Sequence, residues 1–105
     1  MPRRVNGRIQ ALRILLYCLR RNGRDCVGKG LFLKCYWELR KQLPSAIPSI
    51  KVETLLRALR SLAEEGRLVQ RPRHGLYCAD ASSVEAALRS LGLLLPELEL
   101  LREGS

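Results

Sequence analysis

The sequence has few of the residues that most catalytic and metal sites need. It contains one histidine, one tryptophan and only 5% aromatic residues in 105 positions. It has no Gly-rich phosphate loop, no paired carboxylates with a pocket pattern and no His/Cys/Asp constellation. No apolar run approaches the ~20 residues that span a bilayer. We therefore expect neither an enzyme nor a membrane protein, with no cofactor and no small-molecule substrate.

A secretion signal is also missing, which bears on the four cysteines. Residues 1–7 are basic but lack the apolar segment and small-residue cleavage site of a signal peptide. We expect a cytoplasmic, nucleoid-associated protein of a prokaryote, or one encoded by a virus or mobile element. There Cys18, Cys26, Cys35 and Cys78 are expected to be reduced thiols packed as small hydrophobic residues. Their spacing does not reproduce the paired C-x2-C knuckles of zinc sites, so we expect no metal.

Aliphatic residues and positive charge are abundant. The hydrophobic content of 47% and the length suit one compact domain with a leucine-rich core. The formal net charge is +9, unevenly placed: residues 1–80 hold 17 Lys and Arg against 6 Asp and Glu, whereas residues 81–105 hold 2 against 4. A strongly basic small domain attracts polyanions, of which DNA and RNA are the leading candidates here.

Apolar residues recur with helical spacing in three segments. They predict a helix over residues 8–22, a second over residues 31–43 that two following prolines must end, and a third from Ser49 to Gly66. Ser49 is expected to cap the third helix, and Gly66 to close it in the left-handed conformation.

Shorter patterns predict strands. Residues 25–27 suit a strand of two or three residues, and residues 67–70 and 76–78 suit two strands around the cationic turn 71–75. The fold class is therefore mainly α with a small β element. The order is helix, strand, helix, turn, helix, strand, turn, strand.

This order resembles a winged helix-turn-helix DNA-binding domain (α-β-α-α-β-β). The resemblance implies duplex DNA binding, and it places the first strand beside the last, so that Cys26 and Cys78 would be neighbours within the ~7 Å between Cα atoms that a disulfide allows. The third helix and the wing, which is the pair of strands around the turn 71–75, are similar to those in the N-terminal half of ferric-uptake-regulator-like repressors. Their histidine-rich, metal-binding dimerisation domain has no counterpart, so metal sensing is not implied. The residues that carry the resemblance are Val52-Glu53-Thr54-Leu55-Leu56-Arg57-Ala58-Leu59, Leu62, Gly66, Leu68-Val69 and Gly75-Leu76-Tyr77, within a span from Ala11 to Ala79.

Three parts are thus expected: a basic arm over residues 1–7, a winged-helix domain over 8–80 and a leucine-rich C-terminal element over 81–105. Ser82 or Ser83 is expected to cap a fourth helix over residues 83–94. Pro96 is expected to end it and to be followed by a final turn over residues 96–102. The leucines exceed what one small core needs, so we expect a homodimer, with the fold-back of this segment onto the first helix as the alternative. The expected oligomer contacts are Leu88, Leu91, Leu94, Leu95 and Leu98.

The cationic residues suggest how DNA would be bound. We expect the third helix to enter the major groove, where Arg57 would donate two hydrogen bonds to a guanine edge. We expect the basic wing to lie on the DNA backbone or in the minor groove. A solvated charged face, a protein-interaction adaptor and non-specific DNA or RNA binding are the alternatives. The expected nucleic-acid-binding residues are Lys51, Thr54, Arg57, Arg60, Arg71, Arg73 and His74, with Arg3, Arg4 and Arg8 from the start of the chain.

Two further side chains carry open alternatives. Glu53 is expected either to accept from cytosine or to pair with Arg57 four residues later. Trp37 lies off the apolar stripe of its helix. We expect it to pack against the chain before Ile50 or against the C-terminal helix, with base stacking as the alternative.

Overall fold

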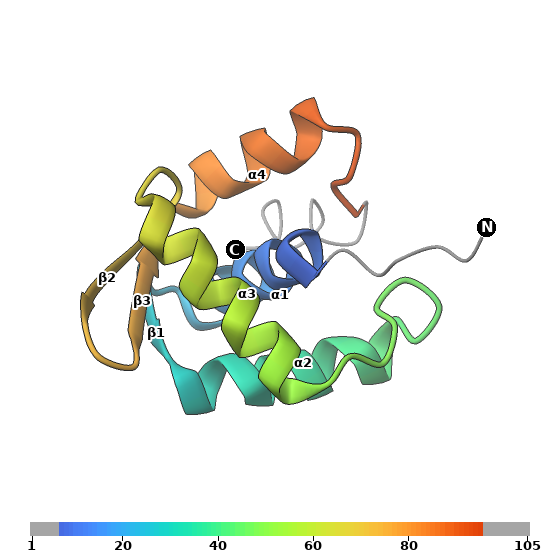
Figure 1. Ribbon diagram of the computed structural model, residues 1–105. Coiled ribbons are helices and arrows are strands. Elements are labelled where there is room, and N and C mark those ends of the chain that lie inside the picture. The colour runs from blue at the N-terminus through green and yellow to red at the C-terminus, as the bar shows by residue number, and fades with distance from the viewer. Residues whose placement is uncertain (1–6, 96–105) are drawn as a thin grey trace.

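The computed structural model describes residues 7–95, which form a mainly helical fold with a small antiparallel sheet (Figure 1). This confirms the expected class in its coarse form. Among these residues, none of the helices combines the length and apolar composition that a bilayer crossing needs. The elements are α1 (Gly7–Asn22), β1 (Cys26–Gly28), α2 (Lys29–Gln42), α3 (Val52–Glu65), β2 (Val69–Arg73), β3 (Leu76–Ala79) and α4 (Ala81–Ser90).

Helix α1 is the centre of the core. Nine of its sixteen residues are buried, on all sides of the helix rather than on the single stripe that the periodicity predicted. The reason is that α2, α3 and α4 all pack against it, with α3 in front of it in Figure 1 and α2 and α4 on either side. The surrounding helices contribute fully buried side chains such as Phe32, Leu59 and Leu88.

The sheet has the strand order β1-β3-β2, so its first strand pairs with its last. Cys26 lies opposite Cys78 in the β1–β3 register, with their Cα atoms 3.9 Å apart, and the two form a disulfide. The expected proximity of these residues is confirmed. Cys18 and Cys35 form a second disulfide between α1 and α2. The expectation of four free thiols is wrong for this structure, because helix packing brings together two cysteines seventeen residues apart.

The ends of α3 differ in how well the sequence predicted them. Ser49 is not the cap: the helix begins at Val52, and the N-cap Lys51 makes no side-chain capping bond. The chain before α3 is held from α2 instead, since the Tyr36 hydroxyl accepts from the Ile50 N–H at 2.8 Å. Gly66 closes the helix as predicted, with φ 67° and its N–H donating to the Leu62 carbonyl oxygen.

Helix α4 starts two residues earlier and ends four residues earlier than predicted. Its cap is Asp80, whose carboxylate accepts from the backbone N–H of Ser83 at 3.2 Å and from the Ser83 hydroxyl at 2.7 Å. The helix stops at Ser90, and Gly92 follows with φ 71°. After it, the Leu93 carbonyl oxygen accepts from Arg13 Nε at 2.8 Å, and burial lowers the pKa of the Arg13 guanidinium.

The leucines after residue 86 do not share one environment. Leu88 is fully buried against α1, so its side chain is unavailable for the oligomer contact that was expected of it. Leu94 and Leu95 are partly buried against the same core, whereas Leu91 is 61% exposed. Leu98 and the final turn expected over residues 96–102 lie outside the described residues. Only Leu91 therefore presents a largely exposed apolar side chain in the described part of this set.

Candidate nucleic-acid interface

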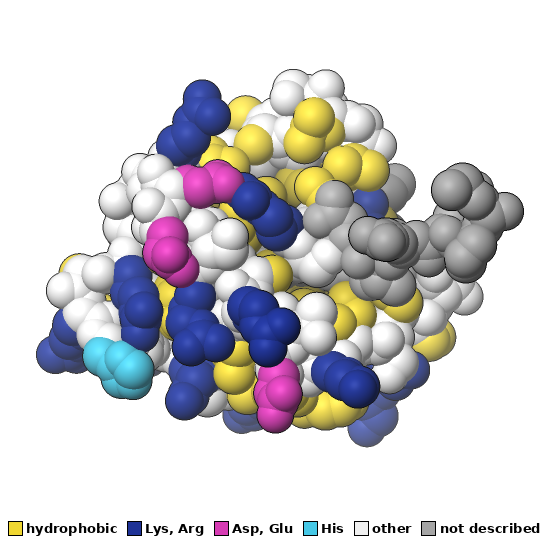
Figure 2. Space-filling view, viewed as in Figure 1, with side chains coloured by type: hydrophobic (Ala, Val, Ile, Leu, Met, Phe, Trp, Pro, Cys, Tyr) yellow, Lys and Arg dark blue, Asp and Glu magenta, His cyan; other side chains and the backbone are white. Residues whose placement is uncertain are grey.

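Helix α3 separates its apolar and cationic residues cleanly. Leu55, Leu59 and Leu62 are buried, whereas Arg57 and Arg60 are exposed on the outer side. Because residues three apart on a helix share a face, the two guanidinium groups project from neighbouring positions on that side. Figure 2 shows Lys and Arg side chains gathered over α3 and the β2–β3 hairpin, with few Asp or Glu side chains among them.

The β2–β3 hairpin adds a second set of polar groups. Arg71 Nη2 lies 2.8 Å from His74 Nδ1, and because a guanidinium can only donate, Nδ1 is the acceptor in this hydrogen bond. The Arg71 guanidinium carbon also lies 5.7 Å from the centre of the Tyr77 ring, a cation–π distance. Tyr77 is only 2% exposed, so a fixed core residue holds Arg71 in place. Gly75 allows the tight turn with φ 77°.

The hairpin turn is attached to the start of α2. The Lys29 backbone N–H donates to the Gly75 carbonyl oxygen at 3.0 Å, which brings the first residue of α2 beside the turn. The first turn of α2 contains no acidic residue, so the partial positive charge of the helix N-terminus is not offset there.

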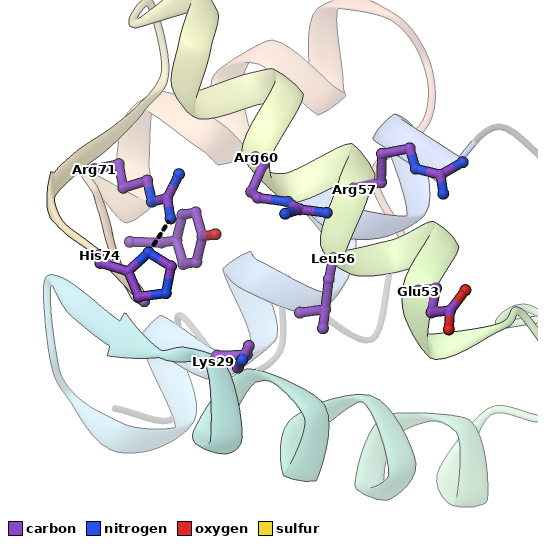
Figure 3. Close-up of a pocket in the computed structure, with 9 residues that line it drawn as sticks. Lys29, Glu53, Leu56, Arg57, Arg60, Arg71 and His74 are labelled. Carbon is purple, nitrogen blue, oxygen red and sulfur yellow. Dashed lines mark hydrogen bonds between the residues drawn. The ribbon is translucent and has the colours of Figure 1, made fainter.

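These elements enclose a cleft of about 230 Å³, the cationic cleft, between α3, the start of α2 and the hairpin. In Figure 3, Leu56 extends from α3 toward α2, with Arg71 and His74 on the hairpin side and Lys29 on the α2 side. Arg57 reaches away from the hairpin and so lies at the rim. The residues that line the cationic cleft are Lys29, Glu53, Leu56, Arg57, Arg60, Arg71, His74, Gly75 and Tyr77.

The cleft is electropositive because its arginines are not neutralised. Within residues 7–95, neither Arg57 nor Arg60 forms an ion pair, and the pairing of Glu53 with Arg57 is not present. Arg20 and Arg89 form ion pairs with Glu85 of α4, and none of these three residues lines the cleft. The cleft lining thus contains four Lys and Arg side chains and one carboxylate. Ammonium and guanidinium donors of this kind bind phosphate.

The structure brings together four of the expected nucleic-acid-binding residues in this cleft and disperses the others. Thr54 on α3, Arg73 on β2 and the N-cap residue Lys51 are exposed but do not line the cleft. Arg8 forms an ion pair with Glu65 at the end of α3, which reduces its use as a phosphate contact. Arg3 and Arg4 lie outside the described residues. The four that line the cleft are Arg57, Arg60, Arg71 and His74.

Lys29 and Tyr77 were not predicted as site residues. Lys29 lies between Gly28 and Gly30 at a strand-to-helix junction, and this position was the one feature of the sequence that could have identified it as a site residue. No feature of the sequence identified Tyr77 as a site residue, because it is a core residue that contacts Arg71 through its ring. Within residues 7–95, no cluster of His, Cys, Asp and Glu side chains could hold a metal ion.

No protein-family model, curated protein or solved structure matches the chain.

Proposed function

We propose that the chain is a winged helix-turn-helix protein, and that it binds duplex DNA. The element order α1-β1-α2-α3-β2-β3 and the sheet order β1-β3-β2 support the first part. The observation that carries the second part is the cationic cleft, where unpaired arginines of α3 meet Arg71 of the hairpin and Lys29 of α2.

In this proposal α3 is the reading element. A helix with side chains is ~10–12 Å wide and enters the ~12 Å major groove of B-DNA. Arg57 and Arg60 project from the exposed side of α3, and Arg57 at the rim is the residue we assign to a guanine edge. Lys29 and Arg71 are assigned to phosphates, because they flank the cleft from the two elements beside α3.

The biological role we propose is that of a small dimeric transcriptional regulator. Two copies related by a two-fold axis would read half-sites about 34 Å apart. Leu91 is the described residue that best suits a contact between copies, because it is 61% exposed. Sedimentation of the full chain tests this: a dimer that Leu91→Asp dissociates is expected, and a monomer at tens of micromolar would contradict it.

DNA binding is tested by fluorescence anisotropy with a labelled duplex over a range of salt concentrations. Lys29→Ala with Arg71→Ala removes the two side chains assigned to phosphates, so it should weaken binding and reduce the slope of log K against log salt by about 0.9 for each lost contact. Arg21→Ala with Arg24→Ala is the matched control, because it removes the same charge from two exposed residues. These residues precede β1, whereas the hairpin turn lies beside the other end of that strand.

The comparison of the two double variants decides the proposal. Equal losses in both would mean that net charge rather than this surface determines affinity, and no binding at low salt would overturn the proposal. Stronger binding to RNA than to duplex DNA, or capture of a protein partner without DNA binding, would favour the alternatives. Selection from a random duplex pool then measures the sequence specificity.

A further inference from the structure

The indole of Trp37 on α2 is unusually exposed for an aromatic side chain. It is 53% exposed, and among residues 7–95 only Leu91 is another large hydrophobic residue exposed to this degree. The expectation that it packs against the chain before Ile50 or the C-terminal helix is therefore not met for about half of the surface of the residue. The neighbouring apolar residues of α2, Phe32 and Leu39, point into the core and are buried.

The exposed ring has a fixed neighbour. The ring centres of Tyr36 and Trp37 are 4.8 Å apart, with the planes tilted by 50°. Tyr36 is fully buried, and its hydroxyl accepts from the Ile50 N–H at 2.8 Å and donates to the Ile50 carbonyl oxygen at 3.2 Å. The indole is thus supported by an anchored ring, which lowers the entropy that a ligand must overcome to order it.

Cations flank the indole on α2. Lys34 and Lys41, three residues before and four residues after Trp37, are exposed and share its face of the helix, about 10 Å apart along the axis. Arg40 adds a third cation beside them, and its buried Nε has no hydrogen-bond partner in the described chain. The one acidic residue of α2, Glu38, lies within 3.4 Å of a tyrosine hydroxyl of α1 instead. This face, the Trp37 stripe, therefore combines a supported flat ring with three positive charges.

We propose that the Trp37 stripe binds single-stranded nucleic acid, with one base stacked on Trp37 and the adjacent phosphates near Lys34, Arg40 and Lys41. A single strand supplies a planar ring and a negative charge with every nucleotide, which matches both features of the stripe. An acidic peptide supplies the charge but not a repeated planar group. In a duplex the faces of the bases are already stacked on one another, so the indole selects an unpaired base.

This surface is separate from the cationic cleft and does not depend on the proposed duplex binding. Trp37, Lys34 and Lys41 are absent from the cleft lining, and the cleft meets α2 only at Lys29. A protein that binds duplex through α3 and an unpaired strand through α2 would favour a junction between the two.

Intrinsic fluorescence tests the proposal directly, because the chain contains one tryptophan. The full chain is titrated with an oligothymidylate of about 12 nucleotides, within the range that single-strand binding folds cover. Saturable quenching is expected, and Arg57→Ala with Arg60→Ala should quench as the wild type does. No quenching at low salt would overturn the proposal, as would equal quenching by polyglutamate.

Variants separate stacking from charge, with anisotropy of the labelled oligonucleotide as the readout. Trp37→Ala should weaken binding roughly 5- to 150-fold, the range that base–aromatic stacking spans, and Trp37→Phe should retain most of the affinity. Lys34→Ala with Lys41→Ala should lower the salt slope by about 1.4. Arg57→Ala with Arg60→Ala removes the same charge from α3 and should retain near-wild-type affinity. Wild-type affinity in Trp37→Ala would overturn the proposal. Circular dichroism confirms folding of each variant, which is expected because the replaced side chains are exposed.

Discussion

Removing one oxygen atom from Tyr36 tests what holds the start of α3 in place. The Tyr36 hydroxyl lies in the core and makes two hydrogen bonds to Ile50, one from its N–H at 2.8 Å and one to its carbonyl oxygen at 3.2 Å. Ile50 is only 9% exposed, so water cannot readily replace the hydroxyl. Tyr36→Phe keeps the ring in place and leaves both backbone groups of Ile50 without this partner.

The expected cost follows from these contacts. A buried N–H that loses its partner costs about 1–3 kcal/mol, and a carbonyl oxygen with a second lone pair costs less. We expect Tyr36→Phe to lower the free energy of unfolding by about 2 kcal/mol. In a domain of this size each kcal/mol shifts Tm by about 4–8 °C, so the loss is measurable.

Tyr17→Phe is the matched control. Its hydroxyl also makes two contacts, but these are longer, 3.4 Å to Glu38 and 3.3 Å from Gln42, and both partners are side chains in a partly exposed region. We expect it to cost about 0.5 kcal/mol. Urea unfolding followed by circular dichroism, with the disulfides intact in all variants, measures both values. A loss below about 0.5 kcal/mol for Tyr36→Phe, or equal losses in the two variants, would refute the argument that Tyr36 anchors the start of α3.

Three further predictions concern stability and covalent state. Glu85→Ala should cost about 3 kcal/mol in urea unfolding, because it leaves Arg20, whose side chain is 13% exposed, without its carboxylate; a loss below about 1 kcal/mol would contradict this. Gly66→Ala should cost about 1–2 kcal/mol because φ is 67°, whereas Gly30→Ala, with no atom within 4 Å of the added Cβ, should be neutral or stabilising; thermal melts in which both behave alike would exclude this reason. Thiol labelling of denatured, unreduced protein should find no free cysteine, and reduction should destabilise the fold by up to about 4 kcal/mol for the pair 52 residues apart; four labelled thiols would contradict the pairing.

The sequence by itself determined the elements and their order. The helical spacing of leucines predicted the bounds of α1, α2 and α3 within a few residues, because apolar residues on the buried face of a helix recur with the helical period. Gly66 ended α3 as predicted, because a left-handed residue at that point favours glycine. The cationic residues of α3 and the hairpin were also visible, and the structure exposes them.

The tertiary structure decided which of these residues meet. Periodicity shows that one face of a segment is apolar but does not show how many neighbours will cover it, so the burial of α1 on all sides and the placement of Leu88 in the core could not be predicted. The cationic cleft needs the contact between Lys29 and Gly75, which are far apart in the chain and joined through backbone atoms that no side-chain pattern reports. Trp37 was visible as a residue off the apolar stripe, yet only packing determined that its ring stays exposed beside an anchored tyrosine.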